Sequence, residues 1–199
     1  STEVEIRAVR DSAEHAGGRD VYMIYEPMAA AIGIGIDVTA PEGNMIVDIG
    51  GGSTEIAVIS LGGIVCSESI NVAGDVFTND IQNYVRQQYE IRIGERTAEN
   101  IKCAIGAAVA ELDEEPEDYV FTGSKIRDNM PFEVRLNYSE IAYALDKSLV
   151  KLDNALMEVL ESMPPELYSD VVKNGIYLAG GGALIKGLDK RLSKKSGLP

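Results

Sequence analysis

The sequence lacks most of the residues on which thiol, zinc and triad chemistry depend. His15 is the only histidine, so a catalytic triad or a zinc site would rest on that side chain alone, and neither is favoured. Cys66 and Cys103 are far apart and form no C-x-x-C pair, so we expect reduced thiols in a reducing cytoplasm. The sequence also has no apolar run long enough to cross a membrane and no N-terminal signal pattern.

Basic residues are scarce as well. The 18 Lys and Arg residues face 32 Asp and Glu residues, which gives a formal net charge of −14. Non-specific nucleic-acid binding is therefore not expected, because phosphate contacts need clustered Lys and Arg. An anionic ligand would have to be held by local donors. The 199 residues suffice for one domain or a two-lobed one, and we expect them to be a segment of a longer protein.

The spacing of apolar residues predicts an α/β fold. Helices are expected at residues 4–17, 26–36, 139–163, 165–175 and 183–195, with residues 75–109 mainly helical. Strands are expected at residues 20–25, 44–49, 54–60, 64–72, 119–126, 132–139 and 176–180. The joints at 50–53 and 62–63 predict antiparallel hairpins, and the acidic stretch 111–118 predicts a solvated loop. Thr97 and Ser139 are the predicted helix caps.

Two triple glycines follow strand-like runs, in "MIVDIGGGSTEIAVIS" (45–60) and "GIYLAGGGALIKGL" (175–188). Known phosphate motifs do not fit the second cluster. Leu188 stands where a P-loop needs Lys, and Ile185 replaces the third glycine of a Rossmann loop. The first cluster lies between two predicted strands, which is the context of neither motif.

The chemistry of both clusters nevertheless indicates a phosphate ligand. Consecutive glycines let backbone N–H groups face a ligand without Cβ interference. Ser53 and Thr54 add hydroxyl donors, and a helix after Gly182 would offer its positive N-terminus. A tight turn explains either cluster alone equally well, but two clusters beside well-placed acids favour a nucleotide site.

Two carboxylates are the candidates for metal and water chemistry. Asp48 lies in an apolar strand, where an unpaired carboxylate is costly, so a cation or donors should meet it. Mg²⁺ usually takes one or two carboxylates, waters and substrate phosphates, and Asp48 suits that role. Glu26, at an expected helix start, suits the positioning of a water for attack on a terminal phosphate. Alternatively, the charge of Glu26 only complements the helix dipole.

Together these residues resemble the actin, heat-shock-chaperone and sugar-kinase superfamily of ATPases, and most specifically the MreB family of bacterial actin homologues. The matching stretches are "YEPMAAAIGIGIDVTAPEGNMIVDIGGGSTEIAVISLGGIV", "ESINVAGD", "IGERTAENIK" and "GIYLAGGGALIKGLDKRL". The resemblance is weakest across residues 113–138. The first stretch with "IGERTAE" favours MreB over the chaperones and the division protein FtsA.

The resemblance implies a role for each candidate residue. Glu26 would position the attacking water, and Asp48 would reach Mg²⁺ through water. Gly50, Gly51, Gly52, Ser53 and Thr54 would form the second phosphate loop, with Gly74 and Asp75 beside the ribose and phosphates. Glu99 and Lys102 would line the adenine and ribose, and Gly180, Gly181 and Gly182 would form the adenosine loop.

The fold that the resemblance implies is an actin-like (ribonuclease H-like) second lobe, with a mixed sheet flanked by helices. A larger subdomain would comprise residues 1–74 and 138–199, and a smaller inserted α+β subdomain residues 75–137. The first lobe of the family, with its first phosphate loop, has no counterpart in this sequence. We therefore expect the isolated lobe to fold but to have little ATPase activity.

The function that the resemblance implies belongs to a longer parent protein. That protein would bind ATP and Mg²⁺, polymerise head to tail and hydrolyse ATP slowly. It would lie in the cytoplasm at the inner face of the membrane, held there through the first lobe. With RodZ-like and other cell-wall elongation partners it would direct peptidoglycan synthesis and rod cell shape. A non-polymerising actin-fold ATPase, chaperone-like or sugar-kinase-like, is the alternative, and a scaffold without catalysis is a third possibility.

Overall fold

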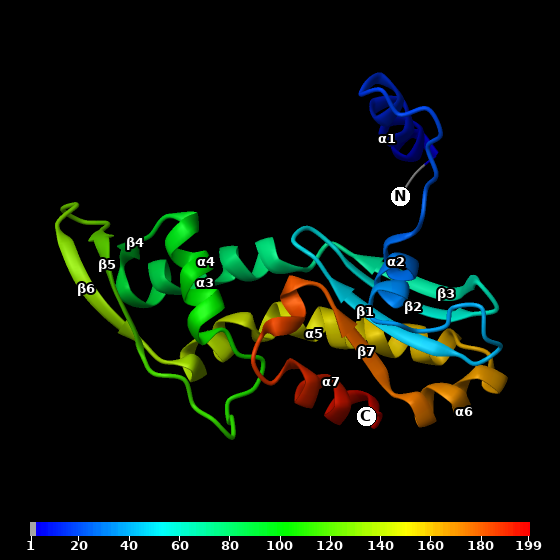
Figure 1. Cartoon of the computed structure of the whole chain (residues 1–199). Helices are drawn as coiled ribbons and strands as arrows, with labels where there is room; N and C mark the ends of the chain where they lie inside the picture. Colours follow the sequence, from blue (N-terminus) through cyan, green and yellow to red (C-terminus); the bar gives the residue numbers. More distant parts are fainter. Residues whose placement is uncertain (1–2) are drawn as a thin grey trace.

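The computed structural model describes residues 3–199, which fold around two sheets (Figure 1). The larger sheet has the order β3-β2-β1-β7, with β1 (Asn44–Ile49), β2 (Thr54–Ser60), β3 (Gly63–Ile70) and β7 (Ile176–Ala179). β2 is antiparallel to β1 and β3, whereas β7 is parallel to β1, so the sheet is mixed as predicted. The smaller antiparallel sheet contains β4 (Ile91–Arg92), β5 (Tyr119–Lys125) and β6 (Pro131–Leu136). Residues 1–2 of the predicted larger subdomain lie outside the described residues.

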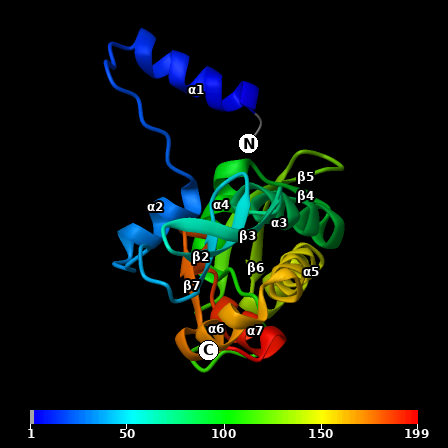
Figure 2. The same cartoon turned by 90° about the vertical axis from the view of Figure 1, so that its right-hand side faces the viewer.

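Helices flank the larger sheet on both sides (Figure 2). The helices are α1 (Glu3–His15), α2 (Glu26–Gly33), α3 (Gly74–Tyr89), α4 (Glu95–Ile105), α5 (Tyr138–Ser162), α6 (Pro165–Asn174) and α7 (Leu188–Ser196), with a short 3₁₀ helix η1 (Gly181–Leu184). Within residues 3–199 none is both long and apolar enough to span a membrane. Ile46 packs with Ala31 of α2, whereas Met45 and Val47 pack in the main core. Because side chains alternate along a strand, Asp48 shares the α2 face with Ile46.

One continuous core runs through both sheets. It contains Ile56 of β2, Phe121 of β5 and the apolar face of α5, including Leu145 and Leu149. The predicted boundaries of the smaller subdomain fall at the first residues of α3 and of α5. The two predicted subdomains therefore share one core, in which α3 packs against α5.

The prediction of a strand at residues 20–25 was wrong. These residues form no strand, and the side chains of Tyr22, Ile24 and Tyr25 are 89%, 56% and 66% exposed. A strand needs a neighbour for its N–H and C=O groups, and among residues 3–199 none lies alongside this segment. Helix α1 buries no side chain and stands apart from the sheets in both views (Figures 1 and 2).

Three predicted helix starts also differ from the structure. Helix α4 begins at Glu95, so Thr97 lies inside it rather than capping it. Asn137 caps α5 in place of Ser139, because a capping box with Glu140 satisfies two backbone N–H groups at once. After Gly182 the chain forms only the short η1, and α7 begins beyond Gly187, which adopts φ +72°. The long helix expected directly after Gly182 is therefore not formed.

Candidate functional site

A cleft of about 740 Å³ lies where the β1–β2 turn meets the starts of α3 and α4 and the residues after β7. Both glycine clusters reach it. Its lining comprises Gly50, Gly51, Gly74, Asp75, Glu95, Arg96, Glu99, Lys102, Cys103, Gly181, Gly182, Leu184 and Ile185. Among these, Glu95, Arg96, Cys103, Leu184 and Ile185 were not predicted to be site residues. A signal for Cys103 was available, since it lies one helical turn after Glu99.

The turn between β1 and β2 presents backbone donors to solvent. The Gly50 N–H closes it on the Ser53 carbonyl at 3.0 Å. The carbonyls of Gly50 and Gly51 accept hydrogen bonds from the N–H groups that start α3. The N–H groups of Gly51 and Gly52 donate to no group in residues 3–199, and both residues are exposed. A turn with its carbonyls bonded and its N–H groups unbonded suits an anion.

The second glycine cluster packs closely against the end of β1. Gly180 has φ +83°, and a Cβ there would lie 2.3 Å from the Ile49 carbonyl oxygen and 2.5 Å from Asp48 Oδ1. At Gly182 a Cβ would lie 2.3 Å from Ile49 Cγ2. Because Gly180 and Gly182 have no side chains, this cluster can lie close to the end of β1 and so to the first glycine cluster. Gly180 contributes to the cleft through packing and does not line it.

Asp48 is a buried carboxylate without a counter-charge among the described residues. Its side chain is 8% exposed, and no hydrogen bond or ion pair within residues 3–199 reaches it. Burial raises the pKa of Asp48, and the charge of Glu55, its cross-strand neighbour, raises it further. The described residues hold no cluster of three or more side chains suited to a metal. Asp48 does not line the cleft, but it lies in β1 just before the β1–β2 turn. A magnesium ion bound mainly by phosphates and waters needs no such cluster, so a single carboxylate at this strand end fits one.

Glu26 and three residues of the turn do not line the cleft. Glu26 is the exposed first residue of α2, the helix that covers the Asp48 face of the sheet. Gly52 and Ser53 lie at the turn beside the cleft. Thr54 is fully buried and its hydroxyl donates to the Val72 carbonyl at 2.6 Å, so the hydroxyl donor expected there does not face a ligand.

Glu99 and Lys102 belong to a bonded group in the cleft lining, next to the first residue of α3. Lys102 Nζ lies 2.7 Å from Glu99 Oε2. The hydrogen bonds from Lys102 and Thr78 hold the pKa of Glu99 below its usual range. Thr78 was missed from the sequence, although it lies four residues after Gly74 and so on the same side of α3.

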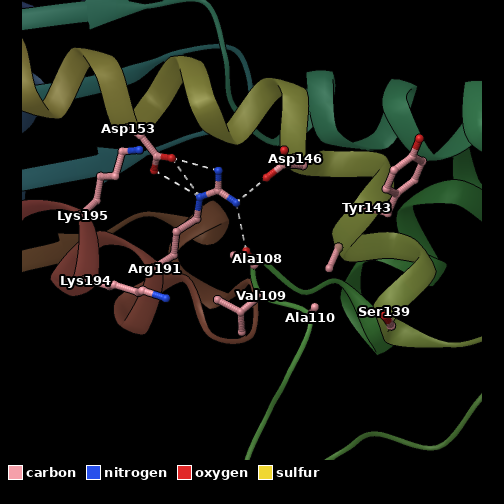
Figure 3. A pocket seen from close by; sticks show the side chains of 11 residues that line it. Ala108, Val109, Ala110, Ser139, Tyr143, Asp146, Asp153, Arg191, Lys194 and Lys195 are labelled. Carbon is pink, nitrogen blue, oxygen red and sulfur yellow. Dashed lines mark hydrogen bonds and ion pairs between the residues drawn. The ribbon is translucent and has the colours of Figure 1, made fainter.

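A second cavity of about 700 Å³ lies between α5, α7 and the segment after α4 (Figure 3). Its central cation, Arg191, is already bonded within the protein. The guanidinium donates to both carboxylate oxygens of Asp153, to Asp146 at 2.8 Å and to the Ala108 carbonyl at 3.1 Å. Arg191 therefore clamps α7 to α5 and to the chain that follows α4, and we assign this cavity no ligand.

The fold belongs to the actin-like class. A solved MamK double helical filament superposes with a TM-score of 0.77 at 21% identity, covering 98% of this chain and 57% of the MamK chain. The family model for the MreB/Mbl protein matches residues 1–199, and the chain belongs to this family.

Relatives of known name support the same assignment. The cell shape-determining protein MreB of Escherichia coli K12 is 47% identical over 199 residues, which are 100% of this chain and 57% of the relative. The cell shape-determining protein Mbl of Bacillus subtilis 168 is 44% identical over 198 residues, 59% of its length. MreB5 of Spiroplasma citri, solved with AMPPNP, has a TM-score of 0.95 at 40% identity and covers 100% of this chain and 59% of its own. The chain thus spans less than two thirds of these proteins.

Proposed function

We propose that this chain forms one side of the nucleotide site of an MreB-type actin homologue that binds ATP with Mg²⁺. The observation that carries the proposal is the exposed β1–β2 turn, whose Gly51 and Gly52 N–H groups have no partner in residues 3–199. This turn lines a cleft of nucleotide size, and Gly181 and Gly182 line the same cleft. The Spiroplasma citri relative was solved with AMPPNP and with ADP, which supports the same ligand class here.

The proposed roles follow the positions of the residues. Residues 50–53 with Gly74 and Asp75 hold the phosphates. Gly181 and Gly182 with Glu99 enclose the nucleoside, and Gly180 lets this cluster pack against β1. Asp48 holds Mg²⁺ through water, and the ion, when bound, neutralises phosphate charge. Glu26 orients the water that attacks the terminal phosphate.

The wider activity is proposed for the full-length protein. It forms head-to-tail filaments in the cytoplasm at the inner membrane face, hydrolyses ATP slowly and directs cell-wall synthesis and cell shape with RodZ-like partners. The larger subdomain (1–74 and 138–199) and the inserted one (75–137) form its second lobe. The relatives named as cell shape-determining proteins favour this function over a non-polymerising chaperone-like or sugar-kinase-like ATPase. Sedimentation of the full-length protein with ATP separates the two, since a persistent monomer supports the alternative.

Replacement of Glu26 by Ala in the full-length protein tests the catalytic assignment. Phosphate release is expected to fall about a hundredfold, because the attacking water is no longer oriented, while ATP affinity stays within about twofold. Steady-state phosphate assays and calorimetry measure the two quantities. Glu42→Ala, at another exposed glutamate, is the control and should change neither. Unchanged phosphate release in Glu26→Ala would remove Glu26 from the mechanism.

Replacement of Asp48 by Asn tests the metal assignment through stability as well as binding. Because the folded pKa of Asp48 is raised, the ionised form destabilises the free protein, and wild-type stability falls as pH rises above the usual carboxyl pKa. Asp48→Asn should therefore stabilise the ligand-free protein at pH 7 by about 1 kcal/mol and flatten this pH dependence. It should also weaken Mg²⁺-dependent ATP binding.

The matched control for this stability change is Asp37→Asn. Hydrogen bonds from Thr39 lower the pKa of the exposed Asp37, so its ionised form stabilises the fold. That contribution is lost as pH falls through the lowered pKa, and Asp37→Asn should destabilise the protein at pH 7. Thermal denaturation without nucleotide measures both stability changes, which should have opposite signs in the two variants. A destabilised Asp48→Asn that still binds ATP-Mg normally would contradict the assignment.

A further inference from the structure

The side chain of Glu55 lies directly opposite that of Asp48 at the base of the β1–β2 hairpin. The two residues are Cα partners in the antiparallel register of β1 and β2. Directly opposite residues project from the same face of a sheet, with Cβ atoms about 4.5–5.5 Å apart. Ile56 and Val58 of β2 pack in the main core, so Glu55 is on the other face, which α2 covers. Two like charges therefore lie side by side next to the turn proposed to hold phosphate.

No cationic side chain of the larger sheet or of α2 balances this pair of carboxylates. The sequence has no Lys, Arg or His between Arg19 and Arg86, a stretch that contains α2, β1, β2 and β3, and β7 has none either. Within residues 3–199 neither Asp48 nor Glu55 forms an ion pair. Because like charges directly opposite each other destabilise a sheet, the pair favours a cation supplied from solution.

The two carboxylates differ in the contacts that they already make. The Ser69 hydroxyl of β3 donates to Glu55 Oε1 at 2.6 Å and so holds the Glu55 side chain. Asp48 is more than nine-tenths buried and has no such partner in residues 3–199. Among the described residues that are not exposed, no side-chain N or O atom is both sealed from solvent and without a hydrogen bond. The unbonded oxygens of Asp48 therefore still reach solvent, and a hydrated ion can approach them.

From this arrangement we infer that Glu55 is a positioning residue for the cation proposed at Asp48, and that its charge, added to that of Asp48, makes tight ATP binding depend on Mg²⁺. This inference rests on the proposed nucleotide site and adds to it. Glu55 does not line the cleft, so it acts through Asp48 and the waters of the ion and does not touch the nucleotide. Without Mg²⁺ both carboxylates repel the phosphates, and with Mg²⁺ both attract the ion that the phosphates also bind.

The test measures the ATP affinity of the full-length protein by calorimetry, once with excess Mg²⁺ and once with EDTA, and takes the ratio of the two affinities. Glu55→Gln is expected to lower this ratio about tenfold, with weaker binding in Mg²⁺ and slightly stronger binding in EDTA. Glu55→Asp keeps the charge and should keep the ratio within about threefold of the wild type. Because Glu55 acts through Asp48, adding Glu55→Gln to Asp48→Asn should change the ratio by less than about threefold.

A second measurement needs no nucleotide. In EDTA, Glu55→Gln should raise the midpoint of thermal unfolding by about 1 °C, because the repulsion between the two opposite carboxylates is removed. The same substitution in an Asp48→Asn background should give no such gain, since the repulsion is already absent there. A gain of equal size in both backgrounds would show that Glu55 and Asp48 do not interact, and would contradict the inference.

Glu68→Gln is the matched control for the binding experiment. Glu68 is also a half-buried carboxylate of the sheet, but it is the register partner of Ile56 and so lies on the opposite face from Glu55. Its replacement removes the same charge and should change the ratio of affinities by less than about twofold.

Three outcomes would count against these assignments, and they can be told apart. If Glu55→Gln leaves the ratio unchanged while Asp48→Asn lowers it, the inference about Glu55 is overturned and the metal assignment of Asp48 is retained. If Glu55→Gln weakens ATP binding equally with Mg²⁺ and with EDTA, the substitution only disturbs the turn, which also overturns the inference. If the wild-type protein binds ATP under neither condition, the proposed nucleotide site itself fails.

Discussion

Replacement of Arg191 by Met is expected to lower the free energy of unfolding by about 3–5 kcal/mol. Asp153 is only 2% exposed and Arg191 only 15%, and the guanidinium donates to both Asp153 oxygens. Removal of the cation leaves a buried carboxylate with no counter-charge, which is the costly half of a buried ion pair. The same change frees the Ala108 carbonyl and Asp146, so α7 loses its polar link to α5 and keeps only its apolar packing. Chemical denaturation measures the loss.

The neighbouring residue provides the control for this experiment. Lys190 pairs with Asp113 at the surface, with side chains 47% and 86% exposed, so Lys190→Met should change stability by less than about 1 kcal/mol. In the double variant Arg191→Met with Asp153→Asn, more than half of the lost stability should return, because the unpaired charge is gone. Equal effects of the Arg191 and Lys190 variants would show that the Arg191 clamp contributes no more than a surface pair.

Replacement of Gly180 by Ala should be the most damaging single change in the glycine clusters, at about 3 kcal/mol or more. Gly180 combines φ +83° with ψ 164°, a region that is essentially restricted to glycine. Its Cβ would also lie 2.3 Å from the Ile49 backbone oxygen, which cannot rotate away. The two glycine walls must then separate, and ATP binding should be lost together with stability. Denaturation and calorimetry on the same variant measure both effects.

Gly181→Ala is the matched control in the adjacent position. A Cβ at Gly181 would meet nothing within 4 Å, and its φ is not positive. The stability of the Gly181→Ala variant should therefore differ from that of the wild type by about 0.5 kcal/mol or less. If Gly180→Ala were equally mild, the close approach of the second cluster to β1 would not be a requirement of the fold.

The sequence predicted correctly those elements that depend on a local pattern of residues. The hairpins β1–β2–β3 and β5–β6 follow from short glycine or polar joints between apolar runs, and α5 follows from its regular apolar spacing. The strand prediction at residues 20–25 was wrong because strand formation depends on a neighbour that the local sequence does not specify. The cap of α5 was misplaced by two residues because Asn137 and Ser139 are both good caps, and only Asn137 has Glu140 at the position that completes a capping box.

The sequence by itself determined the family and the residue types available for a site: two glycine clusters, Asp48 and Glu26. Tertiary structure alone decided which of them meet. The packing of Gly180 on Ile49 brings the clusters together, and the shared core places α4 at the same cleft as the β1–β2 turn. The tertiary structure also decided the hydrogen bonds of Lys102. Its ammonium donates to Gly74 and Thr78, which lie 28 and 24 residues earlier in the sequence. Such contacts depend on the three-dimensional approach of distant segments, and local hydrophobic spacing carries no information about that approach.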